Sequence, residues 1–355
     1  MNKYLITGSC GTVGSGLVNH ILNNDENCEV RCLDNNESAL FFQEQTYLKD
    51  KRVNFFLADI RDKDRLESLF KGVDIVFHAA ALKHVVMCER SPMDSVQTNI
   101  HGVNNIINAS LSADVRKVIF TSSDKAVNPT NVMGTSKLMG ERLITSANLS
   151  QCDSDTIFAS TRFGNVLGSN GSVIPIFKKQ IQMGGPITLT DSNMTRFVMS
   201  VEQAVKLVVS SANIARGGEV FITKMPVLKI KDLAQVMIEE LSDKYGFKPS
   251  EIEVIEVGSK PGEKLYEELM SDEEIRRAVE LENYFSVLPA FRGIYRNINY
   301  DYKDIISNQV DNPYISQNES HMTHDEIREF LYKYNLLCDD ELEQPDQRYW
   351  PGDKE

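Results

Sequence analysis

The feature that most constrains this chain is the regular alternation, over its first half, of short apolar runs with longer amphipathic segments. The apolar runs, which we predict to be strands, are Lys3–Thr7, Val30–Leu33, Val53–Leu57, Ile75–His78, Val118–Ser122 and Thr156–Arg162. The segments between them with helical spacing include Thr12–Leu22, Ala39–Leu48, Arg65–Phe70 and Asn99–Ser110. Strands separated by helices form βαβ units with right-handed crossovers, and therefore a parallel sheet. We predict an α/β fold with a doubly wound parallel sheet, which binds ligands beyond the carboxyl ends of its strands.

The pattern changes in the second half, where the predicted elements are shorter and Gly164–Gly185 is rich in glycine and asparagine. We predict a first domain at 1–164, joined by 197–225, a smaller C-terminal substrate-binding lobe formed mainly by 165–300, and an extension at 301–355. The later predicted helices are Val201–Ala212, Ile230–Lys244, Asp272–Leu281 and Ile327–Tyr332. Capping boxes precede the last two, at Ser271 with Glu274 and at Thr323 with Glu326. We expect the last ~20 residues to be an extended tail.

A glycine-rich turn directly follows the first predicted strand and opens the first predicted helix. Its residues are Gly8, Gly11, Thr12, Val13 and Gly14. Such a turn lets the backbone approach a pyrophosphate at the helix N-terminus, as in a Rossmann-type dinucleotide site. Asp34 ends the second strand 20 residues beyond Gly14 and is placed to accept hydrogen bonds from the adenosine ribose. Only Asn35 and Asn36 follow it, so a 2′-phosphate would meet no nearby cation, and we expect NAD rather than NADP. Asp34 and Glu37 also have capping-box spacing, so the alternative is that Asp34 caps the second helix.

Two further strand ends are predicted to border the cofactor. Asp59 and Ile60 end the third strand, where they could contact the adenine, although Asp59 could equally be a solvated loop residue. Ala79, Ala80 and Ala81 follow the fourth strand as small residues where the backbone must approach the cofactor. We interpret His78, just before them, as a packed strand residue.

The segment after the fifth strand carries the candidate chemistry. Ser123, Asp124 and Lys125 follow that strand directly, and Met133 and Lys137 begin the next predicted helix. Met133 and Lys137 have the spacing at which a short-chain dehydrogenase has Tyr-x-x-x-Lys. An adjacent carboxylic acid and amine form an acid–base pair, although a turn-forming Asp and a surface Lys are the alternative.

The chain resembles the UDP-N-acetylglucosamine 4,6-dehydratases of the polysaccharide-biosynthesis family, which are extended short-chain dehydrogenases/reductases. The matching segments are Phe77–Val85, Asp124–Gly134, Arg162–Ser169, Gly171–Pro175, Met194–Phe197 and Pro261–Leu265. The resemblance extends over residues 1 to about 290. It implies a tightly bound, recycled NAD, a UDP-sugar substrate and a homo-oligomer.

In such enzymes the C4 hydride of the hexose passes to NAD⁺, a base then removes the C5 proton while an acid protonates the departing C6 hydroxyl, and the hydride returns to C6. The resemblance implies that Asp124 is the acid and that Lys125 handles the C5 proton. Lys125 would need a lowered pKa, which burial or a cation such as Lys83 could supply. Met133 cannot accept the C4 hydroxyl proton, so we predict that Asp124 does, directly or through a water, with Ser122 or Ser123 positioning the hydroxyl. Lys137 would reach the nicotinamide ribose.

The same resemblance assigns the remaining site residues. Asn165 and the loop 168–173, with Ser172 and Val173, would hold the diphosphate and uracil. Arg196 is the candidate cation for the pyrophosphate, because a guanidinium matches phosphate oxygens. Glu263 would bind the uridine ribose. Lys83 and His84 would face the substrate, and Asn99 would support the cofactor site.

Composition excludes several classes of protein. A net charge of −13 argues against a nucleic-acid binder. The six cysteines show no metal-ligand spacing, and no apolar run approaches the ~18–20 residues of a membrane span. We expect a cytoplasmic protein without membrane insertion or bound metal.

Two alternatives remain. One is a nucleotide-sugar 4-epimerase or reductase of the same fold, which needs no acid–base pair for C5 and C6 and normally keeps the tyrosine that Met133 replaces. The other is a noncatalytic NAD-binding scaffold protein. Among dehydratases, the segments Leu33–Leu40 and Pro129–Gly134 favour the members that retain the C5 configuration.

Overall fold

The central element of the fold is a twisted, mostly parallel sheet. The computed structural model describes residues 1–150, 154–169, 172–258, 262–291 and 298–338. Within these ranges the large sheet has ten strands in the order β15-β13-β14-β10-β6-β5-β4-β1-β2-β3. Its strands are β1 Asn2–Thr7, β2 Cys28–Asp34, β3 Val53–Leu57, β4 Ile75–His78, β5 Lys117–Ser123, β6 Ile157–Phe163, β10 Val220–Thr223, β13 Ala278–Leu281, β14 Tyr284–Val287 and β15 Ile305–Ser307. The seven strands from β10 to β3 are parallel, and β14, β13 and β15 continue the sheet in antiparallel pairs.

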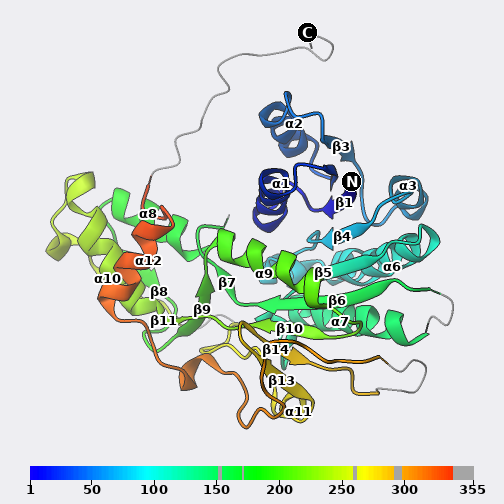
Figure 1. The fold of residues 1–355 in the computed structure, drawn as a ribbon. Coiled ribbons are helices and arrows are strands. Elements are labelled where there is room, and N and C mark those ends of the chain that lie inside the picture. The colour runs from blue at the N-terminus through cyan, green and yellow to red at the C-terminus, as the bar shows by residue number, and fades with distance from the viewer. Residues whose placement is uncertain (151–153, 170–171, 259–261, 292–297, 339–355) are drawn as a thin grey trace.

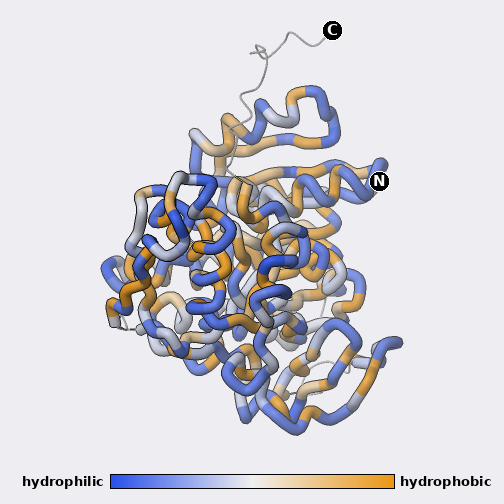
Figure 2. Tube along the Cα trace, turned by 90° about the vertical axis from the view of Figure 1, so that its left-hand side faces the viewer, coloured by the Kyte–Doolittle hydropathy of each residue, from blue (hydrophilic) through white to orange (hydrophobic). Residues whose placement is uncertain are grey.

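Helices cover both faces of this sheet, as the sequence predicts for a doubly wound fold (Figure 1). One face carries α1 Thr12–Asn24 and α9 Val201–Ile214, which pack against each other. The opposite face carries α3 Lys63–Leu69, α6 Gly102–Ser112 and α7 Val132–Ser150. Each face has its own buried apolar cluster, so the parallel strands are covered on both sides. Figure 2 shows hydrophobic residues along the strands inside the molecule and hydrophilic residues in many of the outer loops.

A smaller lobe packs beside the carboxyl ends of these strands. It contains the short strands β7 Asn165–Val166, β8 Ile187–Leu189, β9 Thr195–Met199, β11 Val227–Lys229 and β12 Val254–Glu256. Its helices are α8 Val173–Gln182, α10 Ile230–Leu241 and α12 His324–Lys333, grouped together in Figure 1. A third apolar cluster, with Phe177, Leu233 and Leu331 among its buried members, forms the core of this lobe. The fold is therefore a doubly wound α/β sheet with a smaller C-terminal lobe.

The remaining helical elements are short. They are α2 Glu37–Thr46, α4 Val85–Arg90, α5 Pro92–Ser95 and α11 Asp272–Ile275, the π-helix η1 Val96–His101, and the 3₁₀ turns η2 Asp124–Ala126, η3 Asp243–Tyr245, η4 Pro249–Glu251 and η5 Ser316–Asn318. No helix in the described ranges has both the length and the apolar character needed to cross a membrane.

The helix predicted over Asp272–Leu281 is wrong in its second half. The capping box of Ser271 and Glu274 is present, but α11 ends at Ile275 and the chain continues as strand β13. β13 pairs with β14 and β15 and buries Ala278 and Leu281. Pairing with the sheet edge outweighs local helix propensity here, a long-range effect that spacing does not reveal.

Other predicted elements agree with the structure to within a few residues. The six predicted strands of the first half are all present, and the second capping box, Thr323 with Glu326, starts α12. The predicted helix Asn99–Ser110 starts inside the π-helix η1 and becomes a regular α-helix only at Gly102. The predicted tail falls mostly in 339–355, outside the described residues.

Candidate active site

One long cavity runs across the carboxyl ends of the parallel strands and into the smaller lobe. It has a volume of about 1180 Å³. It is lined by the residues that the sequence predicted individually for cofactor, catalysis or substrate, except Asn99. Of the predicted loop 168–173, Ser169, Ser172 and Val173 line it and Gly168 does not, while 170 and 171 lie outside the described residues. The strand order explains this convergence. From β1 the chain continues to β2 and β3 on one side, and from β4 it continues to β5 and β6 on the other, and ligands bind where the strand order reverses in this way.

The cofactor end of the cavity is built by the glycine turn between β1 and α1. Gly8 has φ +67°, and a Cβ there would lie 2.7 Å from Ala80 Cα. A Cβ on Gly14 would lie 2.0 Å from the carbonyl oxygen of Gly8. Gly11 is the N-cap of α1, whose first residues Thr12 and Val13 line the cavity. The turn therefore brings the N-terminus of α1, whose first backbone amides have no acceptor within the helix, close to the alanines after β4, which fits a dinucleotide pyrophosphate.

Asp34 stands beside this turn at the end of β2. Its carboxylate accepts hydrogen bonds from the backbone nitrogens of Cys10 at 3.0 Å and Asn36 at 2.9 Å. The alternative that Asp34 caps the second helix is wrong, because the N-cap of α2 is Asn36, which accepts from the Ala39 nitrogen at 3.1 Å. Asp34 is thus held rigidly in the cavity wall, where a ribose hydroxyl could reach it.

Asp59 forms an ion pair and is not simply a solvated loop residue. Arg61 Nη2 lies 2.6 Å from Asp59 Oδ2, and this pairing lowers the pKa of Asp59. Arg61, Ile60 and Asp34 line the same cavity, so a guanidinium that the sequence reasoning missed stands near the expected ribose site. Arg61 is remote from Asp34 along the chain, so the residues that follow Asp34 directly, Asn35 and Asn36, do not reveal it.

Asn99 supports the site from behind. Its side-chain amide donates to Leu82 O at 3.0 Å and Ser136 Oγ at 2.9 Å, and its oxygen accepts from the Leu82 nitrogen at 2.9 Å. It thereby links the loop after β4 to α7. His78 is fully buried and contacts Thr7 Oγ1 at 2.7 Å through Nδ1, which agrees with the interpretation as a packed strand residue.

Met133 and Lys137 are buried on the first turns of α7 and line the cavity. Lys137 Nζ donates to Thr121 O at 3.0 Å and lies over the Phe120 ring. Burial lowers the pKa of Lys137 to about 8. Met133 presents a thioether at the position of the usual tyrosine, so no proton-transfer group stands there.

The acid–base pair lies where β5 ends. Ser123 Oγ donates to Asp124 Oδ1 at 2.6 Å, and Lys125 Nζ lies 2.9 Å from Asp124 Oδ2. Burial by itself favours the neutral acid, but the Lys125 ammonium and hydrogen bonds from Ser123 and Glu267 outweigh it and lower the pKa of Asp124. Ser122 Oγ is buried with no hydrogen-bond partner among the described residues. The pair faces the cavity rather than solvent or packing.

The expected lowering of the Lys125 pKa is not found. Burial acts in that direction, but the carboxylates of Asp124 and Glu267 outweigh it and raise the pKa of Lys125. Arg196 is a cation that partly opposes them. Lys125 is therefore an ammonium ion in this arrangement, and work as a base requires that it lose a proton first.

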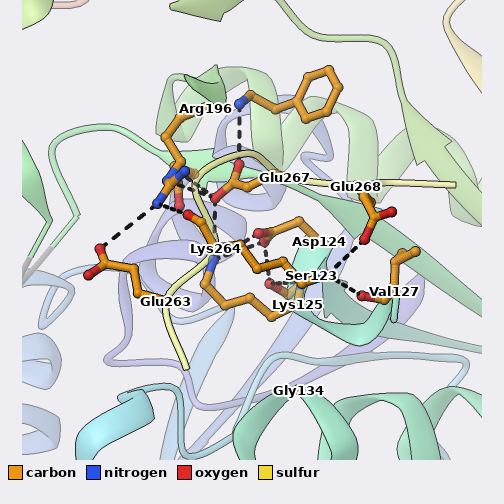
Figure 3. A network of polar contacts seen from close by, with 12 residues as sticks. Ser123, Asp124, Lys125, Val127, Gly134, Arg196, Glu263, Lys264, Glu267 and Glu268 are labelled. Atoms are coloured by element: carbon orange, nitrogen blue, oxygen red, sulfur yellow. Dashed lines mark hydrogen bonds and ion pairs between the residues drawn. The ribbon is translucent and has the colours of Figure 1, made fainter. Parts of the chain in front are cut away.

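A segment of the smaller lobe, residues 262–268, closes over the acid–base pair (Figure 3). We call it the 262–268 segment. Lys264 Nζ donates to Val127 O and to Glu268 Oε2, both at 2.9 Å, which ties the segment to the loop after Lys125. Glu267 Oε1 lies 3.6 Å from Lys125 Nζ. The sequence predicted no role for Lys264, Glu267 or Glu268. The signal available was four charged residues within 263–268, which overlaps the matching segment Pro261–Leu265.

Arg196 holds this segment rather than standing free for a phosphate. Its Nη1 donates to Thr195 O at 2.8 Å and Leu265 O at 3.2 Å, and its Nη2 donates to Lys264 O at 2.9 Å. Its Nε lies 3.2 Å from Glu267 Oε1, and Nη2 is 3.9 Å from Glu263 Oε1. The bidentate phosphate contact predicted for Arg196 does not fit, because nearly all of its donors already have protein acceptors.

The remaining predicted substrate residues lie along the far part of the cavity. Asn165 Nδ2 donates to Glu267 Oε1 at 3.0 Å, so it too lies close to the acid–base pair. Ser172 is the N-cap of α8, and its buried Oγ has no partner among the described residues. Glu263 is partly exposed near Thr190. Lys83 and His84 line the cavity from the loop after β4, where partial burial lowers the pKa of Lys83.

The chain is similar to known proteins over most of its length. A family model described as polysaccharide biosynthesis protein matches residues 4–289. A membrane protein of unassigned function from Methanocaldococcus jannaschii is 51% identical over 80% of this chain and 85% of its own. A UDP-N-acetylglucosamine 4,6-dehydratase (inverting) from Campylobacter jejuni is 38% identical over 82% and 84%, respectively.

Two further similarities extend over more of the chain. A UDP-glucose 4-epimerase from Rickettsia bellii is 35% identical over 94% of this chain and 96% of its own. The solved structure of Pen from Bacillus thuringiensis is 40% identical, covers 95% of this chain and 98% of its own, and superposes with a TM-score of 0.87.

Proposed function

Because the chain belongs to the polysaccharide biosynthesis protein family of nucleotide-sugar dehydratases and epimerases, we propose that it is a 4,6-dehydratase that converts UDP-N-acetylglucosamine to a UDP-4-keto-6-deoxy-N-acetylhexosamine. The observation that carries the proposal is the Asp124–Lys125 pair at the end of β5, in a cavity that also reaches the glycine turn and Glu263. An epimerase needs no such pair for C5 and C6.

The cofactor in this proposal is NAD, held by the glycine turn and by Asp34. A bound nicotinamide would accept the C4 hydride of the hexose and return it to C6. Asp34 favours NAD, but Arg61 in the same cavity wall is a candidate partner for a 2′-phosphate if its pairing with Asp59 opens. Affinities for the two cofactors, measured on the apo-protein, test this preference.

The side chains divide the proton transfers between them. Asp124 takes up the C4 hydroxyl proton and later gives it to the departing C6 hydroxyl. Lys125 removes the C5 proton and returns one to C5. Ser123 holds Asp124, and Lys137 faces the cavity beside them. One base on one face of the sugar favours retention at C5, which a proton spectrum of the product would report.

At the nucleotide end, the proposal assigns Ser172 and the N-terminus of α8 to the diphosphate and Glu263 to the uridine ribose. The described part of the chain contains five cysteines, all free thiols, which suits the cytoplasm, where UDP-sugars are made. Assembly into a homo-oligomer is part of the same proposal.

The decisive experiment is incubation of the purified protein with UDP-N-acetylglucosamine in deuterated water without added reductant. We expect a 4-keto-6-deoxy product with deuterium at C5 and no net change in NADH. Asp124→Asn and Lys125→Ala variants should bind cofactor normally and lose turnover by roughly 10²- to 10⁴-fold, as removal of an acid or base does. Normal turnover by both variants would refute the site assignment.

The second candidate is a nucleotide-sugar 4-epimerase, which the similarity to the Rickettsia bellii enzyme over 94% of this chain favours. It predicts a C4 epimer and no deuterium on any carbon. A noncatalytic scaffold protein would give neither product.

A further inference from the structure

A buried carboxyl group, Glu267, lies behind Lys125 as seen from the cavity. Lys125 Nζ lies 2.9 Å from Asp124 Oδ2 on one side and 3.6 Å from Glu267 Oε1 on the other. Glu267 is 4% exposed and is not among the residues that line the cavity. It can therefore act on a bound sugar only through its neighbours Lys125 and Asp124.

The surroundings of Glu267 combine one anion with two cations. The charged groups that face it are Asp124 and Lys125 from η2 and Arg196 from β9, and its hydrogen-bond donors are Asn165 Nδ2 at 3.0 Å and the Phe197 nitrogen at 3.2 Å. Burial and the Asp124 charge raise the pKa of Glu267 to about 7, against the opposing effect of Lys125 and Arg196. Both protonation states of Glu267 are therefore accessible near neutral pH.

The proposed dehydration needs such a group. Lys125 must be neutral to remove the C5 proton, yet the two carboxylates raise its pKa. Asp124 cannot take the ammonium proton, because in the proposed reaction it is already occupied by the proton from the C4 hydroxyl. A third group has to hold the proton of Lys125 while the C5–H bond breaks.

We propose that Glu267 accepts the ammonium proton of Lys125, so that Lys125 becomes the base for C5 once Asp124 has been protonated by the C4 hydroxyl. This inference rests on the proposed dehydratase function. Glu267 is a positioning and proton-holding residue that acts through Lys125, and it does not touch the sugar.

The protons balance over one turnover. An N–H bond of Lys125 breaks and an O–H bond of Glu267 forms, and neutral Lys125 then takes the C5 proton. Asp124 gives the former C4 hydroxyl proton to the C6 oxygen, which leaves as water. Lys125 returns a proton to C5, and Glu267 returns its proton to Lys125. The sugar has lost one water, and all three side chains end as they began.

The test is a Glu267→Gln variant, whose amide keeps an acceptor for Asn165 and Arg196 but cannot take up the proton. We expect kcat to fall by roughly 100-fold or more, with little change in KM. Reduced nicotinamide should still appear in a single turnover, because C4 oxidation uses Asp124, while deuterium incorporation at C5 slows. A wild-type kcat that rises with pH through about 7, as Glu267 ionises, should become flat in the variant.

Two other variants separate the proton role from a structural one. Glu267→Asp keeps an ionisable group and should restore part of kcat and the dependence on pH. The control variant is Glu280→Gln on β13. Glu280 Oε1 lies 2.8 Å from Lys224 Nζ, and neither residue lines the cavity, so this change should leave kcat unchanged.

A readout without substrate or turnover is infrared spectroscopy of the protein below and above pH 7. The wild type should show a protonated carboxyl band that disappears as pH rises through about 7 and that Glu267→Gln lacks, whereas any band from Glu219, whose pKa burial also raises, should remain in both proteins. If no such band exists, or if Glu267→Gln keeps the wild-type kcat and pH profile, the inference is overturned while dehydration by the wild type still stands. If the wild type forms no 4-keto-6-deoxy product, the proposed function itself fails.

Discussion

The two ends of the cavity are built in different ways. The cofactor end is local: the glycine turn lies within one strand–turn–helix unit, and Asp34 ends the next strand. The acid–base end is assembled from four distant segments, at 123–125, 165, 196 and 262–268, which meet through Glu267 and Arg196 (Figure 3).

Because of this difference, we expect cofactor binding and proton transfer to depend on different parts of the molecule. The turn can hold a pyrophosphate without help from the smaller lobe, because its backbone amides are fixed by the β1–α1 unit itself. The protonation of Lys125 depends on burial and on Asp124, and also on Glu267 and Arg196, which the smaller lobe supplies. A disturbance of the 262–268 segment should therefore impair proton transfer and spare cofactor binding.

The strongest challenge to this comparison is Arg196→Lys. A lysine cannot reproduce the contacts of the guanidinium with three carbonyl oxygens and Glu267, so the 262–268 segment should shift relative to Lys125. A displacement of about 1 Å can cost roughly 100-fold, and we expect a fall of that order in kcat with cofactor affinity unchanged.

Steady-state kinetics and cofactor titration measure the two effects of this change. The matched control is Arg328→Lys, at a surface cluster with Glu239 and Glu240 on the far side of the lobe, which should leave kcat intact. An equal loss of cofactor affinity in Arg196→Lys would show that the two ends are not independent.

A smaller effect, at the other end, is expected from Gly14→Ala. The new Cβ would lie 2.0 Å from Gly8 O, so the turn must deform, and cofactor affinity should fall by roughly 10- to 100-fold. Gly11→Ala, with its Cβ 3.2 Å from the same oxygen, should cost less. Calorimetric titration with NAD and with UDP measures both, and weakened UDP binding would contradict a local role for the turn.

The smallest effect is expected from Met133→Leu. The side chain is buried and similar in volume, so stability should fall by less than about 1.5 kcal/mol. Turnover should fall by much less than the roughly 100-fold that loss of an acid or base costs, because a thioether transfers no proton. Thermal unfolding and kcat check this, and a larger loss would mean that Met133 positions the sugar.

The sequence by itself determined the elements whose signal is short in range. Apolar runs predicted the six strands of the first half, and the glycine spacing predicted the tight turn between β1 and α1, both of which the structure contains. The adjacent Asp124 and Lys125 were found because their neighbourhood resembles a known family. For the strands and the glycine turn, the informative residues lie within one strand or one turn.

Only the tertiary structure decided what depends on segments far apart along the chain. β13 is a strand because it pairs with β14 at the sheet edge. Arg61 lines the same cavity as Asp34, and Arg196 donates its hydrogen bonds to the 262–268 segment. The rise in the pKa of Lys125 comes from two carboxylates that outweigh the opposite effect of burial, and one of them lies 142 positions away in the sequence. Charges and burial act through space, so the electrostatics of this site follow from the fold and not from residue spacing.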